Sequence, residues 1–297
     1  MLLNRRDFLS GSGAVAATLR FGPIWAESHP RRHGLRVLAE CDCVFFGASA
    51  FAIAAAASNP GCVIIERGLS PGAEFSGALL PNRIAQQPQS EVAQEIFNLV
   101  KAEGLYADGL VHTPPVADVL SEFIRKKAVN IFLNAEITAV RPADGGYEIR
   151  ILGSDGHSAV RCRRIVDTTP LAWRDAAQES VTAKFLSAAL VGGKKEDIKK
   201  FASQGFVIYD GALDGESYFR IKLKSDASWS EARLELYESF EAFSASGDCP
   251  FRLGAEATEF GYEYSTSSRE IAQNWRWMAG AAFPDLISAL DGGTLWS

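Results

Sequence analysis

The chain of 297 residues has few cysteines and no excess of positive charge. Its five cysteines are odd in number and lack a repeated C-x-x-C spacing, so they are too few for a disulfide scaffold and poorly arranged for structural zinc. With 30 basic and 36 acidic side chains the formal charge is -6, which disfavours a protein that grips nucleic acid or an anionic membrane. We therefore predict neither a metal site nor a nucleic acid partner.

Motifs for several common enzyme classes are also missing. The sequence contains no G-x-x-x-x-G-K-[ST], H-E-x-x-H or G-x-S-x-G pattern, so nothing points to a P-loop nucleotidase, a zinc protease or a serine hydrolase. What is present is a globular composition, with 47% hydrophobic and 22% charged residues. A chain of this length forms one or two domains. The function classes that these observations leave open are a soluble enzyme and a binding domain.

Residues 1–26 contain the pair Arg5-Arg6, followed by a weakly apolar stretch that is too short to span a membrane. The segment resembles a twin-arginine export signal, and the alternative is an ordinary basic N-terminus. The resemblance implies passage through the twin-arginine translocation machinery to the periplasm or another exported location, often with a cofactor already bound. Residues 27–34 are polar and contain Pro30, which predicts a linker.

A strand, a turn and a helix open the predicted folded domain. The apolar run 43–46 predicts a buried parallel strand, and residues 49–58, almost all alanine, predict a helix that lies close against a sheet. A second apolar strand, 63–65, ends at Glu66. This is a βαβ unit, and its first turn stands where dinucleotide-binding proteins carry a glycine fingerprint.

The fingerprint here has Gly47, Ser49 and Ala52 where the pattern asks for three glycines. Gly47 can make the tight turn, the Ser49 hydroxyl can donate to a phosphate, and Ala52 adds one methyl group between helix and strand. Glu66 follows Gly47 by nineteen residues, where an acidic side chain accepts from ribose hydroxyls. A βαβ unit that binds no nucleotide is the alternative.

The elements predicted between residues 116 and 170 indicate whether the dinucleotide is FAD or NAD. Residues 116–128 have helical spacing, 130–140 reads as a strand, and 147–152 and 158–162 read as hairpin strands between two turns. An apolar strand over 164–170 then ends at Asp167, Thr168 and Thr169-Pro170.

This order of elements resembles the FAD-binding domain of FAD-dependent oxidoreductases of the glutathione-reductase-like superfamily. NAD-linked Rossmann domains lack the inserted meander. The resemblance implies that the backbone around Glu136 and Ile137 contacts adenine and that Asp167 and Thr168 lie near the dinucleotide. Pro170 replaces the usual glycine of that segment.

The C-terminal residues 274–297 resemble the closing motif of the same superfamily. A strand ends at Gly280, and a helix over 284–290 is predicted to face the flavin with its amino end. Ala281 stands where the family usually has an aspartate. The candidate cofactor residues are thus Gly47, Ser49, Ala52, Glu66, Arg67, Ile137, Asp167, Thr168, Gly280 and Ala281.

We predict an α/β fold, a Rossmann-like FAD-binding domain made of a parallel sheet plus a β-meander, with a small inserted α+β substrate or cap domain. The cofactor domain is discontinuous, 35–170 and 271–297, and the insertion spans 171–270. His112, Tyr209 and Arg220 are candidates for catalysis by side-chain chemistry only, so no catalytic residue is assigned.

The predicted function is an exported FAD-dependent oxidoreductase that transfers hydride from a small organic substrate to flavin and passes electrons to an unknown acceptor. The alternative is a catalytically degenerate flavin-fold protein that serves as a periplasmic binding or accessory protein. The departures at Ser49, Ala52, Pro170 and Ala281 motivate that alternative.

Overall fold

The computed structural model describes residues 35–80, 82–202, 207–245 and 249–296. The predicted export signal, 1–26, and the predicted linker, 27–34, lie outside the described residues. Leu35–Ser297 forms one compact unit. Within the described part of the chain, no helix combines the length and apolar character needed to cross a membrane.

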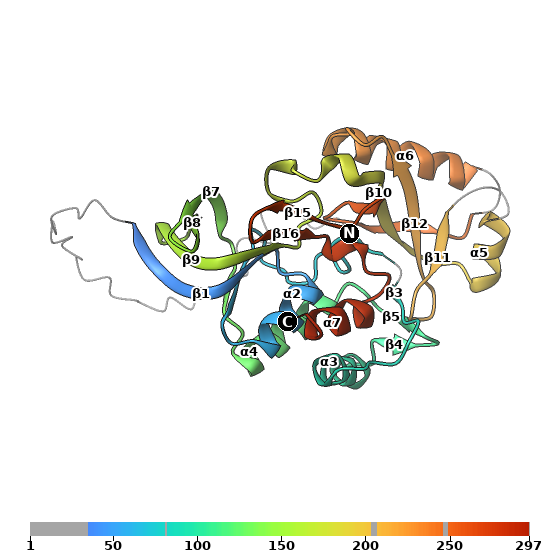
Figure 1. Ribbon diagram of the computed structural model, residues 1–297. Coiled ribbons are helices and arrows are strands. Elements are labelled where there is room, and N and C mark those ends of the chain that lie inside the picture. Colours follow the sequence, from blue (N-terminus) through green and yellow to red (C-terminus); the bar gives the residue numbers. More distant parts are fainter. Residues whose placement is uncertain (1–34, 81, 203–206, 246–248, 297) are drawn as a thin grey trace, which may run out of the picture. The chain divides into compact units, whose positions relative to one another are not determined.

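The main sheet has eight strands, five of them parallel and in the spatial order β6, β2, β1, β9, β16 (Figure 1). The other three strands of this sheet are antiparallel to their neighbours: β15 pairs with β16, and β8 pairs with β7 and β9. The bounds are β1 Arg36–Phe46, β2 Cys62–Ile65, β6 Ile131–Phe132, β7 Glu136–Ala143, β8 Gly146–Gly153, β9 Gly156–Asp167, β15 Ser268–Ala272 and β16 Trp275–Met278. This confirms the predicted parallel sheet with a β-meander.

Three predicted strands differ from those observed. The segment 130–140 is not one strand, because Asn134 adopts a left-handed conformation, with φ of 52°, and separates β6 from β7. Asparagine tolerates this conformation better than most residues. Conversely, the predicted strands 158–162 and 164–170 are parts of a single strand, β9, which pairs with β1 along most of its length. On its other side, the first half of β9 pairs with β8 of the meander and the second half pairs with β16.

Four helices cover one face of the main sheet (Figure 1): α2 Ala50–Ser58, α3 Glu91–Ala102, α4 Val116–Lys127 and α7 Leu286–Thr294. Small side chains let α2 lie close to the sheet, and its residues from Ala50 to Ala56 are all buried. The meander covers the other face, where Val44 and Phe46 pack against Ile149 and Trp275. Burial on both faces explains the apolar runs of β1 and β2.

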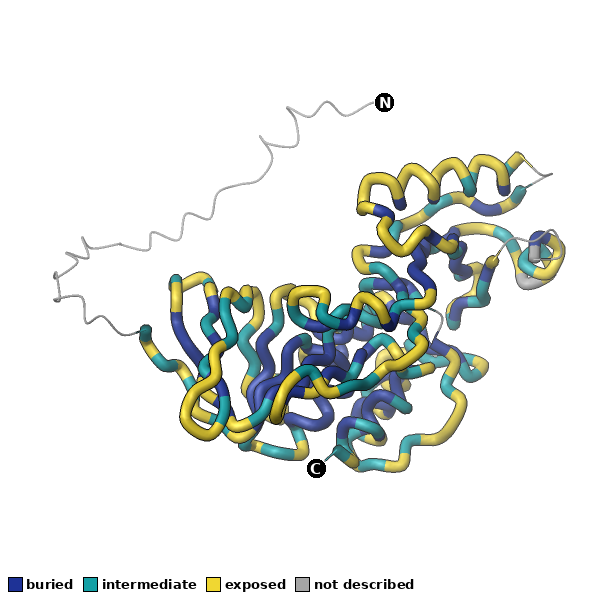
Figure 2. Tube along the Cα trace, turned by 45° about the horizontal axis from the view of Figure 1, so that its top comes forward, coloured by how far each residue is buried: buried dark blue, intermediate teal, exposed yellow. Residues whose placement is uncertain are grey.

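A second sheet is built from residues between β9 and β15, in the order β11, β12, β10, β13, with β14 also paired to β10. Two helices accompany it (Figure 1), and much of the outer surface of α6 is exposed (Figure 2). The bounds are β10 Val181–Val191, β11 Ile208–Asp210, β12 Glu216–Leu223, β13 Arg252–Glu256, β14 Gly261–Tyr264, α5 Lys195–Ala202 and α6 Trp229–Ala245. Its core, which includes Phe219 and Phe243, is a cluster separate from those of the main sheet.

The remaining elements are short. A three-stranded sheet consists of β3 Asn82–Arg83, β5 Leu110–Val111 and β4 Tyr106–Ala107. Single 3-10 turns occur at η1 Trp173–Asp175, η2 Gln178–Ser180 and η3 Gly280–Ala282. The sequence did not predict the three-stranded sheet, α3 or β10.

Candidate functional site

The carboxyl ends of four parallel strands meet at one edge of the main sheet, as expected for strands that run in the same direction. The Gly47 N–H donates to the Ile65 carbonyl at 2.9 Å, and the Thr168 N–H donates to the Phe46 carbonyl at 2.8 Å. The Gly280 N–H in turn donates to the Thr168 carbonyl at 3.0 Å. The structure therefore brings together the turns that follow β1, β2, β9 and β16.

Gly47 is required at this edge by its conformation and by its neighbours. Its φ is +85°, and a Cβ atom there would lie 3.1 Å from Thr168 Oγ1 and 3.2 Å from Thr169 Cγ2. The Thr168 hydroxyl donates to the Phe46 and Gly47 carbonyls, at 2.9 and 3.0 Å. Thr168 thus ties the ends of β1 and β9 together through its side chain.

Ser49 has a capping role in the structure. Its hydroxyl oxygen accepts from the Ala52 N–H at 3.1 Å, which makes it the N-cap of α2. A Cβ atom on Gly280 would lie only 2.5 Å from the Ser49 Cβ, so the turn after β16 packs directly on this serine. Ala52 is fully buried behind it. This contact is close because position 280 has no side chain.

Glu66 lies at the end of β2, where the sequence placed it. One carboxylate oxygen accepts from the Ala48 N–H at 2.7 Å and the other accepts from the Gly68 N–H. Arg67 next to it is largely exposed, and its Nε lies 3.7 Å from a carboxylate oxygen of Glu136. Ile137 follows on β7, and its carbonyl accepts from the Trp173 indole N–H at 3.4 Å. Arg67 and the start of β7 therefore lie beside each other, near the end of β2.

Asp167 is completely buried and points into the protein. Its carboxylate accepts from the Trp173 N–H at 2.6 Å, from the Thr169 N–H at 3.1 Å and from the Thr169 hydroxyl. Burial raises the pKa of this carboxyl to about 6, and the three hydrogen bonds oppose that rise. Asp167 thus holds the turn that follows β9.

Glu74 also lies at this edge, although the sequence did not predict it as a site residue. It belongs to the turn segment 71–79, which is fixed to the edge by the Gly72 N–H donating to the Ala48 carbonyl at 2.8 Å. The Glu74 carboxylate accepts from the Ala50 N–H at 2.7 Å, at the amino end of α2. Burial raises the pKa of Glu74 to about 7, and the nearby negative charge of Glu66 contributes to that rise.

We expect the raised pKa of Glu74 to make the protein less stable as pH rises. The folded-state pKa lies above the ordinary value of 4.5, so the folded protein binds more protons than the unfolded chain between about pH 4.5 and 7, and stability falls across that window. In Glu74→Gln, the free energy of unfolding should fall less with rising pH than in the wild type. The difference should be about 1–2 kcal/mol, a figure that allows for the partial exposure of Glu74. Urea unfolding at pH 5 and pH 8 measures it. Glu238→Gln, an exposed change on α6, is the matched control.

The amino end of α7 is capped by the protein itself. Asp285 accepts from the Ser288 N–H at 2.9 Å, and Asn82 Oδ1 accepts from the Leu286 N–H at 3.1 Å. The Asn82 side-chain N–H₂ group is buried without a partner among the described residues. Ala281 lies in η3, just before this helix.

A bound FAD fits these residues only in part. Glu66, Arg67 and the start of β7 suit the nucleoside end, because ribose hydroxyls need a carboxylate acceptor. The diphosphate needs the free N–H groups at the amino end of α2. Glu74 already occupies the Ala50 N–H, and Ser49 occupies that of Ala52.

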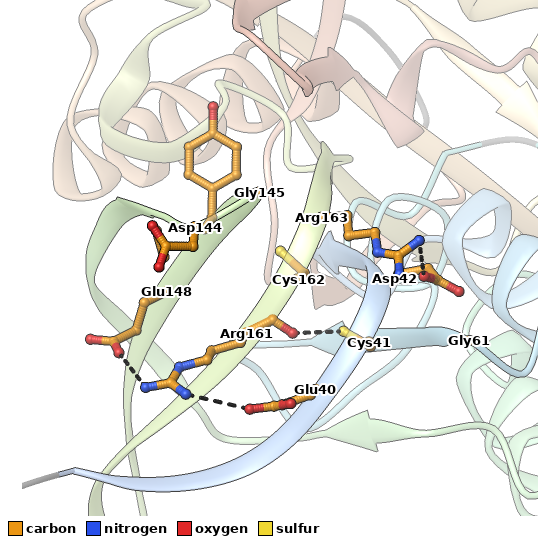
Figure 3. A pocket seen from close by; sticks show the side chains of 12 residues that line it. Glu40, Cys41, Asp42, Gly61, Asp144, Gly145, Glu148, Arg161, Cys162 and Arg163 are labelled. Atoms are coloured by element: carbon orange, nitrogen blue, oxygen red, sulfur yellow. Dashed lines mark hydrogen bonds and ion pairs between the residues drawn. The ribbon is translucent and has the colours of Figure 1, made fainter.

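Two described cavities lie elsewhere. One, of about 670 Å³, adjoins the β7–β8 turn and the middle of β1 and β9 (Figure 3), and both of its arginines are paired with carboxylates. Arg161 lies between Glu40 and Glu148, at 3.4 Å from each, and Arg163 is 3.5 Å from Asp42. The second, of about 550 Å³, lies between the carboxyl end of α2 and the start of α3.

The three side chains named as catalytic candidates lie in two other groups. His112 Nδ1 is 2.6 Å from a carboxylate oxygen of Glu216, which also accepts from the Tyr218 hydroxyl. The Arg220 guanidinium lies over the Phe185 ring, 3.4 Å from its centroid, and donates to the Tyr209 hydroxyl. The described contacts join none of the three to the residues at the carboxyl edge.

Neither a family model nor a curated protein sequence matches this chain. Solved structures do resemble it in fold. The p-nitrophenol 4-monooxygenase PnpA of Pseudomonas putida DLL-E4 is 15% identical, with a TM-score of 0.51 over 82% of this chain and 73% of that one. A geranylgeranyl bacteriochlorophyll reductase-like protein of Thermoplasma acidophilum is 12% identical, with a TM-score of 0.53 over 88% and 77%.

A third similar structure is the rebeccamycin biosynthetic enzyme RebC with reduced flavin, 10% identical with a TM-score of 0.50. The match covers 83% of this chain and 56% of RebC, so this chain spans little more than half the length of that enzyme. At these identities the likeness concerns the fold. The chain has the Rossmann-like α/β fold of flavoprotein oxidoreductases, which confirms the predicted fold class.

Proposed function

We propose that this protein is an exported FAD-dependent oxidoreductase that acts on a small organic substrate and passes electrons to a separate acceptor. The observation that carries the proposal is the carboxyl edge of the parallel sheet. There Gly47, Glu66 and Gly280 lie on three neighbouring turns at the start of α2, and the antiparallel meander that distinguishes FAD-type domains adjoins β9.

The residues of this chain would divide the binding of FAD between them. The Glu66 carboxylate would accept from the ribose hydroxyls, and Arg67 with the backbone of β7 would hold the adenine. Flavin, when bound, supplies the hydride acceptor. The second sheet, β10 to β14, is where we place the substrate-binding surface.

The visible spectrum of the purified protein tests this proposal. We expect bound flavin, or flavin absorbance gained on incubation with FAD, and a Glu66→Ala variant should bind FAD at least about tenfold more weakly because it loses the ribose acceptor. An exposed change such as Glu238→Ala should have no effect. Folded protein that neither carries nor takes up FAD would falsify the proposal.

Export is proposed from the Arg5-Arg6 pair. Replacing both arginines with lysine keeps the charge but should abolish passage through the twin-arginine machinery. We expect the wild-type protein in the periplasm and the double variant in the cytoplasm, as measured by cell fractionation. Equal periplasmic amounts would instead favour an ordinary basic N-terminus.

A second candidate function follows from the contacts at the amino end of α2. Because Glu74 and Ser49 occupy N–H groups that a diphosphate would use, the protein could have kept the flavin fold while serving as a binding or accessory protein. Such a protein binds flavin weakly, or holds flavin that resists photoreduction and reoxidation. Reversible photoreduction of bound flavin would exclude it.

A further inference from the structure

We propose that Glu74 is the protein's own occupant of the anion position at the amino end of α2, and that the diphosphate of a dinucleotide binds there only when the Glu74 carboxylate has left or is neutral. This inference rests on the proposed function, because it concerns how the same edge would accept FAD. It identifies a residue that sets both the affinity of the site and its dependence on pH.

The geometry places Glu74 where an anion binds. Its carboxylate accepts from the Ala50 N–H at 2.7 Å, and Ala50 is the first residue of α2. The N–H groups in the first turn of a helix lack partners within the helix and carry the positive end of its dipole. A diphosphate at this position would compete with Glu74 for the same donor.

An ordinary N-cap does not account for this contact. Ser49 already caps α2 by accepting from the Ala52 N–H, and Glu66 accepts from the Ala48 N–H. Glu74 reaches the helix from a separate turn segment, which is anchored by the Gly72 N–H and by the buried Phe75 ring. The contact is therefore an additional carboxylate held against the helix by tertiary structure.

The surroundings of Glu74 disfavour a further anion. Glu66 lies at the end of β2, and the pKa of Glu259, in the loop between β13 and β14, is raised by burial and by the Glu66 charge. The pKa of Tyr264, on β14, is raised by burial and, to a smaller extent, by the negative charge of Glu74. The positive charge of Arg67, a largely exposed side chain, opposes the rise at Glu259.

These charges give a definite dependence on pH. Burial raises the pKa of Glu74 to about 7, so most of the carboxyl is protonated at pH 6 and most is charged at pH 8. If only the protonated form admits the diphosphate, the affinity for FAD is scaled by the protonated fraction, which falls about tenfold between those pH values. Binding should therefore weaken as pH rises.

Titration of the full-length protein with FAD, followed by flavin fluorescence at pH 6 and pH 8, tests the proposal. For the wild type we expect Kd to rise about tenfold between the two pH values. Glu74→Ala should bind FAD equally well at both, at least as tightly as the wild type does at pH 6. Glu74→Gln keeps the shape without the charge and should also lose the pH dependence, which provides a second variant if alanine impairs folding. Glu238→Ala is the charge-matched control and should behave like the wild type.

The outcomes separate this inference from the proposed function. FAD binding that is the same in wild type and Glu74→Ala at both pH values overturns the role of Glu74 and leaves the flavoprotein proposal intact. Binding by Glu74→Ala but not by the wild type supports the role of Glu74 and shows that the native protein is not a flavoenzyme under those conditions. If no folded variant binds FAD at either pH, both proposals fail.

Discussion

Replacing Gly293 with alanine is expected to destabilise the protein by about 2–4 kcal/mol, since α7 and α2 touch at this position. A Cβ atom on Gly293 would lie 2.1 Å from the Phe51 carbonyl oxygen and 3.0 Å from the Ala54 Cβ. Those atoms belong to α2, which is buried along nearly its whole length and cannot move away. The two helices would have to separate.

Helix propensity acts in the opposite direction at Gly293. Alanine is favoured over glycine inside a helix by about 1 kcal/mol, which alone would make the variant more stable. The overlap with a backbone carbonyl outweighs that gain, because removing it needs a shift of a whole buried helix. The sign of the effect is therefore set by packing.

Gly292→Ala provides the matched control for this prediction. It lies in the same helix, but a Cβ atom there meets the ring edge of Phe283 at 2.9 Å, a side chain that can rotate. We expect a change within about 1 kcal/mol. Thermal and urea unfolding of both variants give the comparison, and equal stabilities would show that the α2–α7 contact is looser than described.

Asp167→Ala is expected to cost about 3 kcal/mol, because three donors lose their acceptor in a fully buried position. The Trp173 N–H and the Thr169 N–H would then be left without partners, and the turn after β9 would loosen. Asp167→Asn keeps the volume but replaces one acceptor oxygen with a donor, so we expect a smaller loss. Urea unfolding measures both, and Asp118→Ala, an exposed aspartate on α4, is the control.

The cost at Asp167 should also depend on pH. The folded-state pKa is raised to about 6 from 3.8, so the wild type gains stability from this group as pH falls through that window. The difference between wild type and Asp167→Ala should therefore be larger at pH 5 than at pH 8. A difference that is equal at the two pH values would mean that Asp167 titrates normally in the folded protein.

Several elements could be predicted because their signals are local. The apolar runs before Gly47 and Glu66 have the length of buried strands, and the alanine-rich segment between them has the propensity of a helix. The turns at Gly145 and Gly156 mark the meander, since both glycines adopt positive φ. Once the strands are known to be parallel, their following residues must share one edge, so Glu66, Thr168 and Gly280 could be placed there together.

Other features had no local signal. Asn134 divides one predicted strand into two through a single left-handed residue, which a pattern of apolar residues does not reveal. Strand β10 is buried at the centre of the second sheet, and its role depends on pairing with β12, β13 and β14. The proximity of Ser49 to Gly280 arises from the close meeting of two turns that are far apart in sequence.

The sequence by itself determined the opening βαβ unit, the meander and the fold class, because periodicity, propensity and turn chemistry act between near neighbours. Only the tertiary structure decided which donors at that edge are already occupied. Glu74 reaches the amino end of α2 from a turn without periodicity, and Asp167 points inward to Trp173. Such hydrogen bonds depend on the direction of a side chain across packed elements, which the sequence pattern does not contain.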